Sequence, residues 1–127
     1  MTDSSGGAAA AAVARLRERG VDTLVVAGCD TFGMMRGKRL PIDQSARALD
    51  HGMLMCDVFW VMHIDEAEIV PRPEGHIGYF PTEKEGYPDI LAVPDLDTLR
   101  AVPWHERTAL VLADFTHQDG HPIPIAP

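Results

Sequence analysis

The chain has 127 residues and a mass of 13.9 kDa, a length that accommodates one domain with a single hydrophobic core. Its formal net charge of −8 and pI of about 5.0 make the surface acidic, which disfavours nucleic acid as a partner. A hydrophobic content of 46% and a charged content of 24% are typical of globular proteins and exclude wholesale disorder.

Cysteine usage and hydropathy indicate the compartment. Cys29 and Cys56 are far apart in sequence and form neither a metal-type pair nor a disulfide framework, so we expect both thiols to lie in strands. No apolar run approaches the roughly 20 residues of a membrane helix, and no basic segment precedes the alanine run 8–12 as it would in a secretory leader. These features predict a soluble cytoplasmic protein.

The first part of the chain predicts a helix and then a strand. Residues 1–7 are small and polar, and we expect them to be mobile. Residues 8–19 are strong helix formers and end before Gly20, a suitable C-cap. The segment 21–29 is an apolar, partly β-branched run of strand length.

A hairpin and a short helix are expected next. Asp30 and Gly33 supply turn chemistry, so the first strand should turn into a second one over residues 34–40. Pro41 presets the backbone angle that a helix start requires. Gly52 is a stop signal for the short helix that follows.

The middle of the chain contains an apolar run and a long loop. Residues 53–64 are apolar apart from Asp57 and His63, which predicts a strand covered on both faces. Residues 65–86 are rich in Glu, Pro and Gly without clear periodicity, which is typical of a long functional or mobile loop.

The last part of the chain completes the sheet. Residues 90–93 form a short strand that Pro94 closes, and Asp95 caps one helical turn. The segment 108–115 is strongly apolar, 117–120 is a turn, and the proline-containing segment 121–125 suits an edge strand. We therefore predict an α+β fold: a mixed sheet of about five or six strands, one packed helix and an N-terminal helix.

Three groups of residues are similar in order and spacing to the amino-terminal domain of the glutamine synthetase family. They read Asp30-x-x-Gly-x-x-Arg-Gly-Lys38, Thr98-Leu-Arg-x-x-Pro-Trp104, and a terminal hairpin with Asp114, Asp119, Gly120 and Pro122. The resemblance runs from about residue 21 to residue 127. It implies a β-grasp domain over 21–127 after a flexible N-terminus and short helix over 1–20, without the family's catalytic domain.

The resemblance also implies a function. In that family the small domain packs against the catalytic domain of a neighbouring subunit, and an Asp after the first helix helps to bind the ammonium or amine nucleophile. Asp57 is the closest positional match, and Asp89 resembles the acidic residue before the next strand, where we expect a substrate contact. Glutamine-forming members continue with Gly-Ser-Ser, whereas this chain continues with Val58-Phe59-Trp60, which favours larger amines.

Elementary chemistry agrees with such a role for Asp57. A carboxylate attracts an amine cation at close range, desolvation strengthens that attraction, and the same group can accept a proton before attack. The implied activity is ATP-dependent ligation of glutamate to an amine or ammonia in a homo-oligomer. ATP and Mg or Mn are expected in the missing catalytic domain, so the isolated chain should be inactive.

Alternative interpretations remain for the chain and for its side chains. The chain could be a stand-alone β-grasp interaction module without catalysis, and Asp57 could be a structural carboxylate bonded to backbone amides. Arg36 and Lys38 could bind an anionic substrate, but charges on a strand edge more often block association with another strand, so a structural role is favoured for both. Trp104 could cover the sheet. Four further residues resemble a cluster of metal ligands but lack the defined ligand set of a zinc site: His63, Asp65, Glu66 and Glu68.

Overall fold

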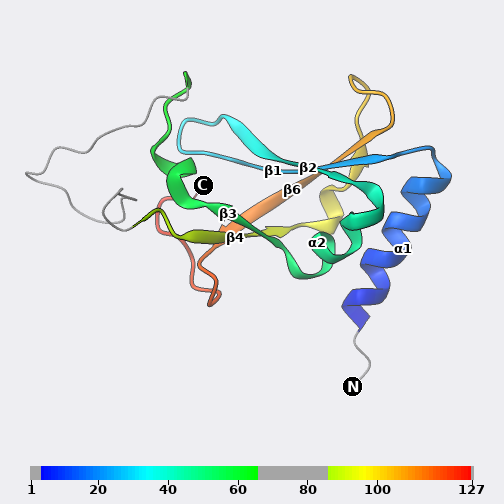
Figure 1. The fold of residues 1–127 in the computed structure, drawn as a ribbon, viewed down its shortest axis with the longest axis horizontal. Helices are drawn as coiled ribbons and strands as arrows, with labels where there is room; N and C mark the ends of the chain where they lie inside the picture. The colour runs from blue at the N-terminus through cyan, green and yellow to red at the C-terminus, as the bar shows by residue number, and fades with distance from the viewer. Residues whose placement is uncertain (1–3, 66–85, 127) are drawn as a thin grey trace, which may run out of the picture.

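The computed structural model describes residues 4–65 and 86–126 (Figure 1). The predicted long loop falls almost wholly outside these residues. The α-helices and strands are α1 (Ser4–Glu18), β1 (Thr23–Cys29), β2 (Met35–Pro41), α2 (Ser45–His51), β3 (Met53–Cys56), β4 (Asp89–Pro94), β5 (Arg100–Ala101) and β6 (Thr108–Thr116). Short 3₁₀ helices include η1 (Ile42–Gln44), η2 (Asp57–Val61) and η4 (Leu96–Thr98).

The strands form one mixed sheet in the order β2-β1-β6-β4-β3, with β5 paired to β6 beside this path. β1 and β6 are parallel, and the other pairs are antiparallel. The two central strands carry side chains with no exposed surface, including Leu24, Val26 and Val111. The predicted α+β fold with a mixed sheet of five or six strands is therefore confirmed.

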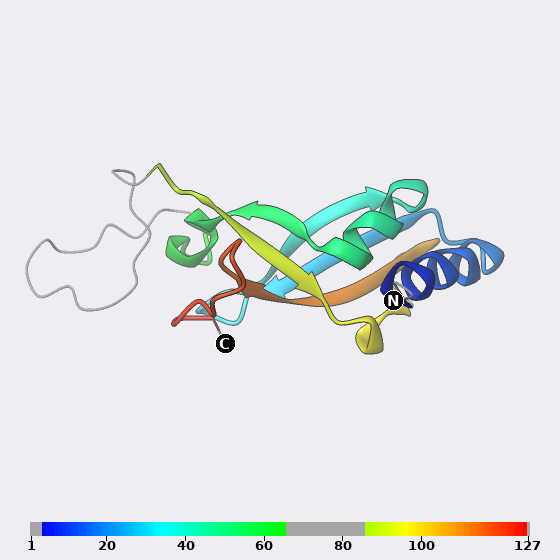
Figure 2. The same ribbon diagram turned by 90° about the horizontal axis from the view of Figure 1, so that it is seen from below.

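Both helices belong to the same core as the sheet. Val13 and Leu16 of α1 and Leu49 of α2 join a single buried cluster with side chains of β1, β4 and β6. Figures 1 and 2 show α1 at one end of the sheet with α2 between it and the strands. Within the described residues, no helix has the length and apolarity needed to cross a membrane.

Glycine-based stop signals located the ends of the helices correctly. Gly20 and Gly52 follow α1 and α2 with φ of 78° and 73°, a region that L side chains rarely adopt. The start of α1 was predicted less well, because the helix begins at Ser4 rather than at residue 8. The alanine run propagates the helix toward its N-terminus through two glycines, as expected from cooperative helix formation.

The prediction of one strand over residues 53–64 is wrong. β3 ends at Cys56, and the chain continues as η2. Phe59 and Trp60 are neighbours in sequence, and both rings pack against Phe115. In a strand, adjacent side chains point to opposite faces and would not reach the same ring. β3 is also an edge strand, and Leu54 is 44% exposed.

Two expectations for the last part of the chain also fail. Residues 121–125 form no strand and contribute only an isolated bridge between Thr116 and Pro122. Proline lacks the N–H group that a strand ladder requires, so the segment cannot pair further. Trp104 does not cover the sheet, because 72% of its surface is exposed.

Candidate functional site

Asp57 lies where the chain leaves β3 and enters η2. Its side chain is nearly inaccessible, with 2% of its surface exposed. β3 and β4 pair with Cys56 opposite Asp89, and the amide of Asp57 donates to the carbonyl oxygen of Pro88 at 3.2 Å. The two paired strands therefore fix the backbone from which this carboxylate extends. A cation that enters the same desolvated space would feel a stronger attraction than in bulk water.

A concavity of about 370 Å³ opens beside Asp57. Asp89 lies exposed at its rim, and Gln118 Nε2 donates to the carbonyl oxygen of Asp89 at 3.0 Å. This hydrogen bond holds the turn after β6 against the start of β4. The structure thus brings together the two site residues predicted from the sequence. The lining consists of Asp57, Pro88, Asp89, Ile90, His117, Gln118 and Asp119.

Asp119 is a third carboxylate in this lining, and sequence reasoning did not assign it to the site. The turn that carries it is closed by a hydrogen bond from the Gly120 amide to the His117 carbonyl oxygen at 2.9 Å. Asp119 accepts from the amide of His121 at 3.0 Å and lies 2.9 Å from that residue's Nδ1. These two hydrogen bonds lower the pKa of Asp119, so the group is anionic at neutral pH.

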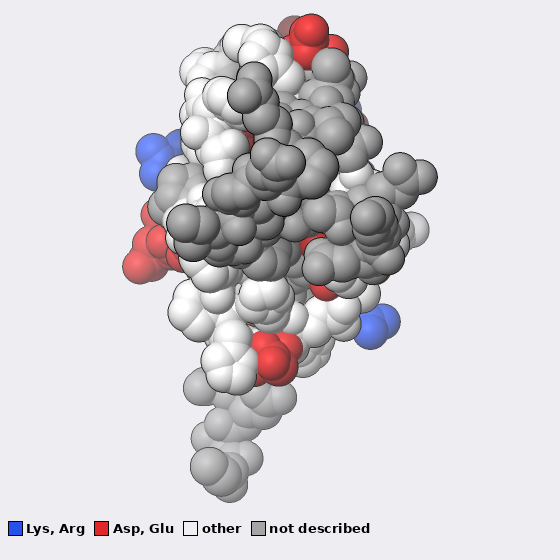
Figure 3. All heavy atoms as spheres, turned by 90° about the vertical axis from the view of Figure 1, so that its left-hand side faces the viewer, with Lys and Arg blue, Asp and Glu red and all other residues white. Residues whose placement is uncertain are grey.

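The concavity has acidic surroundings. Its described lining contains three aspartates and neither Lys nor Arg. Figure 3 views the end of the molecule opposite α1. Among the described residues visible there, Asp and Glu side chains occur at several separate points, and Lys and Arg side chains lie at the margins. Carboxylates that face one space repel each other, and a bound cation relieves the repulsion. The arrangement therefore suits an ammonium or amine cation, whose N–H groups are donors.

Two side chains of the Val58-Phe59-Trp60 sequence, Phe59 and Trp60, pack inside the hydrophobic core. The ring centroids of Phe59 and Trp60 lie 4.7 Å apart, and both rings contact Phe115 of β6, at 4.8 and 5.3 Å. Such close aromatic pairs stabilise beyond their burial alone. The two aromatic residues anchor η2, which begins at Asp57, and they are absent from the described lining of the concavity.

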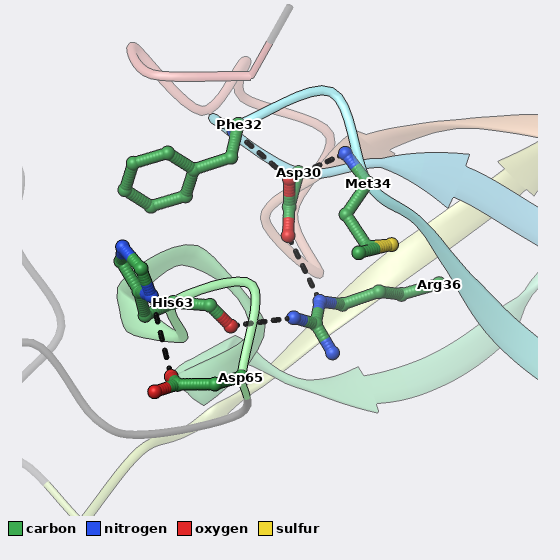
Figure 4. Close-up of polar contacts among 6 residues, drawn as sticks. All are labelled: Asp30, Phe32, Met34, Arg36, His63 and Asp65. Carbon is green, nitrogen blue, oxygen red and sulfur yellow. Dashed lines mark hydrogen bonds and ion pairs between the residues drawn. The ribbon is translucent and has the colours of Figure 1, made fainter.

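A buried ion pair organises the turn between β1 and β2 (Figure 4). Asp30 Oδ2 accepts from Arg36 Nε at 2.8 Å, and Oδ1 accepts from the amides of Phe32 and Met34, each at 2.9 Å. Burial raises the pKa of Asp30, but the hydrogen bonds from Arg36 and from the two amides outweigh it, so the pKa is lowered. Arg36 also donates to the carbonyl oxygen of His63 at 2.9 Å. This cluster is structural.

Two basic side chains of β2, Lys38 and Arg36, are held by groups of the domain itself. Lys38 Nζ donates to the carbonyl oxygen of Leu54 at 2.9 Å. Arg36 is held by Asp30 and His63. These contacts are consistent with the structural role favoured for both side chains. They join the two edges of the sheet in addition to protecting the β2 edge.

The described residues do not assemble a metal site from the predicted candidates. His63 Nδ1 lies 3.2 Å from Asp65 Oδ1 (Figure 4), whereas Glu66 and Glu68 lie outside the described residues. Within residues 4–65 and 86–126, no three His, Cys, Asp or Glu side chains are grouped in a way that could hold a metal ion. The described residues therefore supply no ligand set for a divalent metal, which the family resemblance places in the catalytic domain instead.

Curated proteins with similar sequences include three enzymes. A glutamate–isopropylamine ligase from a Pseudomonas species is 33% identical over 115 residues, which are 88% of this chain and 23% of that protein. Type-1 glutamine synthetase 2 of Dictyostelium discoideum is 34% identical over 104 residues, 80% of this chain and 18% of that protein. A gamma-glutamylethanolamide synthetase of Streptomyces coelicolor is 32% identical over 111 residues, 84% of this chain and 22% of that protein.

Solved structures agree with the fold. A GmaS/ADP complex matches with a TM-score of 0.62 and 24% identity, covering 91% of this chain and 22% of that one. GmaS without ligand matches with a TM-score of 0.61 and 25% identity, covering 91% and 23%. No family model matches the chain.

This chain spans less than a quarter of the length of each of these relatives. The matched part is their amino-terminal part. The similarity extends over most of the chain and agrees with the fold. The chain therefore belongs to the glutamine synthetase family, as the counterpart of its amino-terminal domain.

Proposed function

We propose that this chain is the amino-terminal domain of an ATP-dependent ligase that joins glutamate to an amine or to ammonia. In this proposal it contributes one part of an active site that lies between subunits. The observation that carries the proposal is the burial of the Asp57 carboxylate beside a concavity that Asp89 and Asp119 also line. Similarity to amide-forming ligases over 88% of the chain supports it.

The role proposed for Asp57 is to bind the nucleophile. An alkylammonium or ammonium ion is attracted to the carboxylate, and it must lose a proton before its nitrogen can attack. In this proposal Asp57 holds the cation by charge-assisted hydrogen bonds and accepts that proton. Asp89, exposed at the rim of the same concavity, is proposed to contact the substrate.

The remaining chemistry is proposed to belong to a catalytic domain, in cis or in a neighbouring subunit of a homo-oligomer. ATP, with Mg or Mn, would there activate the carboxylate of glutamate by phosphoryl transfer. The domain contributed here comprises residues 21–127, preceded by the segment 1–20. Free thiols at Cys29 and Cys56 support a cytoplasmic location.

Reconstitution tests the proposal. The chain is mixed with, or joined to, a glutamine synthetase-like catalytic domain, and phosphate release is measured with ATP, glutamate and a panel of amines that includes ammonium. The expected result is no activity for the chain alone and amine-dependent release for the combination. Asp57→Asn should raise the KM for the amine about tenfold or more, because it removes a charged hydrogen-bond acceptor, and should leave the KM for ATP unchanged.

Asp43→Asn is the matched control, because Asp43 is exposed in η1 and is paired with Arg17 on the surface. This variant should behave like the wild type. Complex formation without any gain in activity over the catalytic domain alone would contradict the proposal. That outcome, with partner binding insensitive to Asp57→Asn, would favour the stand-alone interaction module.

A further inference from the structure

A second hollow, of about 540 Å³, lies between α1 and η4, away from the candidate site. Figure 2 shows the segment that contains η4 beside the amino-terminal half of α1. We name this hollow the α1–η4 groove. Its apolar lining comprises Ala8, Ala11, Ala12, Leu16, Leu96 and Leu99, and its charged lining comprises Arg15, Arg19, Arg100 and Asp97.

The charge of the groove is opposite to that of the chain. Three arginines and one aspartate line it, whereas the whole chain has a formal net charge of −8. Arg17, also on α1, is paired with Asp43. Within the described residues, by contrast, no carboxylate forms an ion pair with Arg15, Arg19 or Arg100. Three cations around one hollow repel each other, so the groove is complementary to an anionic partner.

Backbone hydrogen bonds position the arginines. Arg15 lies in the last turn of α1, and Arg19 follows the end of the helix at Glu18, where its amide donates to the carbonyl oxygens of Arg15 at 3.3 Å and Leu16 at 3.1 Å. The side chains of both arginines line the groove. Arg100 Nε donates to the carbonyl oxygen of Thr98 at 3.0 Å, a contact that uses one of the five N–H donors of its guanidinium group. The remaining donors can form forked hydrogen bonds with carboxylates.

The size and the apolar part of the groove indicate the shape of the occupant. From Ala8 to the end of α1 at Glu18 the helix rises by about 15 Å, at about 1.5 Å per residue. This length matches about five residues of an extended peptide. Alanine and leucine side chains offer contacts that a compact inorganic anion cannot use, whereas an extended peptide can direct alternate side chains to an apolar surface and to the cations.

We propose that the α1–η4 groove is a docking site for an acidic peptide segment of a partner protein. Carboxylates of the segment bind Arg15, Arg19 and Arg100, and its apolar side chains pack on the alanines and leucines. This inference is independent of the function proposed for Asp57.

Binding of a labelled hexapeptide of alternating Glu and Leu to the 127-residue chain tests the proposal by fluorescence anisotropy. A hexapeptide of alternating Gln and Leu is the neutral control. The acidic peptide should bind about tenfold more tightly or better, and added salt should weaken its binding. The double variant R15E/R19E should lose about tenfold or more in affinity.

Two further variants sharpen the experiment. Arg47→Glu makes a similar change at an exposed position of α2 outside the groove and should leave the affinity unchanged. Asp97→Asn removes the one carboxylate of the described lining and should strengthen the binding of the acidic peptide. Circular dichroism checks folding, which should persist because all the substituted side chains are exposed.

Three outcomes would overturn the docking site. The first is equal affinity for the acidic and neutral peptides, which would show that charge plays no part. The second is a loss of affinity in Arg47→Glu as large as that in the groove variants. The third is displacement of the peptide by inorganic phosphate or by a single-stranded RNA as effectively as by unlabelled acidic peptide, which would assign the groove to anions in general.

Discussion

Lys38 Nζ lies 2.9 Å from the carbonyl oxygen of Leu54, although the two residues belong to strands at opposite edges of the sheet. Arg36, two residues earlier on β2, makes a second such bridge to the carbonyl oxygen of His63 at 2.9 Å. The sheet therefore curls until β2 and the segment around β3 and η2 approach each other. Exposed edge strands promote association with other chains, and these bridges occupy backbone groups that would otherwise be open to pairing.

Removing the first bridge should destabilise the domain. Lys38→Met keeps an apolar stem of similar length but cannot donate to Leu54, so we expect the free energy of unfolding to fall by about 1 kcal/mol. Urea denaturation followed by circular dichroism measures this change. Arg47→Met, at an exposed position of α2, should stay within about 0.5 kcal/mol of the wild type. Equal effects of the two substitutions would show that the bridge does not stabilise the fold.

The Asp30–Arg36 pair should make stability depend on pH. Asp30→Asn at neutral pH leaves the Arg36 guanidinium without its charged acceptor, so we expect a loss of about 2–3 kcal/mol. The folded-state pKa of Asp30 is lowered, so its contribution is fully present above the unfolded-state value of about 3.9 and is lost as pH falls through the lower folded-state pKa.

Acid titration of unfolding in urea checks this sign. The difference in stability between wild type and Asp30→Asn should be constant from neutral pH to about pH 5 and should shrink below about pH 4. A difference that stays constant through the acid range would mean that ionisation of Asp30 does not stabilise the folded state.

Local chemistry in the sequence predicted much of the fold. Turn residues such as Asp30 and Gly33 located the hairpin, whose register then pairs Cys29 with Met35 as the first partners beyond the turn. The run 53–64 was assigned wrongly because hydrophobicity alone does not distinguish a strand from a 3₁₀ helix. Tertiary contacts decide there, through the end of pairing at Cys56 and the inward packing of two adjacent aromatic rings.

The candidate site could be predicted only in part for a similar reason. Asp57 and Asp89 were named through family resemblance, and the structure places them at one concavity. Asp119 reaches the same concavity because β4 pairs with β6, with Leu91 opposite Thr116. That pairing joins segments far apart in sequence, and the Asp119-Gly120 signal predicts a turn without indicating which strand the turn faces.

Substitution by alanine should lower the stability of the fold at Gly28 and raise it at Gly7. An added Cβ at Gly28 would lie 2.7 Å from the backbone oxygen of Ala113 and would also overlap the ring of Phe115, so Gly28→Ala should cost about 1–3 kcal/mol through overpacking. Gly7 in α1 has no neighbouring atom within 4 Å of such a Cβ, so Gly7→Ala should stabilise the helix by about 0.5 kcal/mol. Thermal unfolding of both variants measures the two signs, and destabilisation by Gly7→Ala would contradict a helix through that position.

The two tryptophans should respond differently to a solvent quencher. Trp60 is 3% exposed and packs among aromatic rings. Trp104, which follows β5, is 72% exposed. Trp104→Phe should leave emission that is shifted to the blue and poorly quenched by acrylamide, because the remaining indole is shielded from water. Trp60→Phe should leave emission at longer wavelength that acrylamide quenches efficiently, provided that circular dichroism shows a folded chain. Equal quenching of the two folded variants would mean that η2 does not bury its aromatic side chains, and the position of Asp57 at the start of η2 would then lose its support.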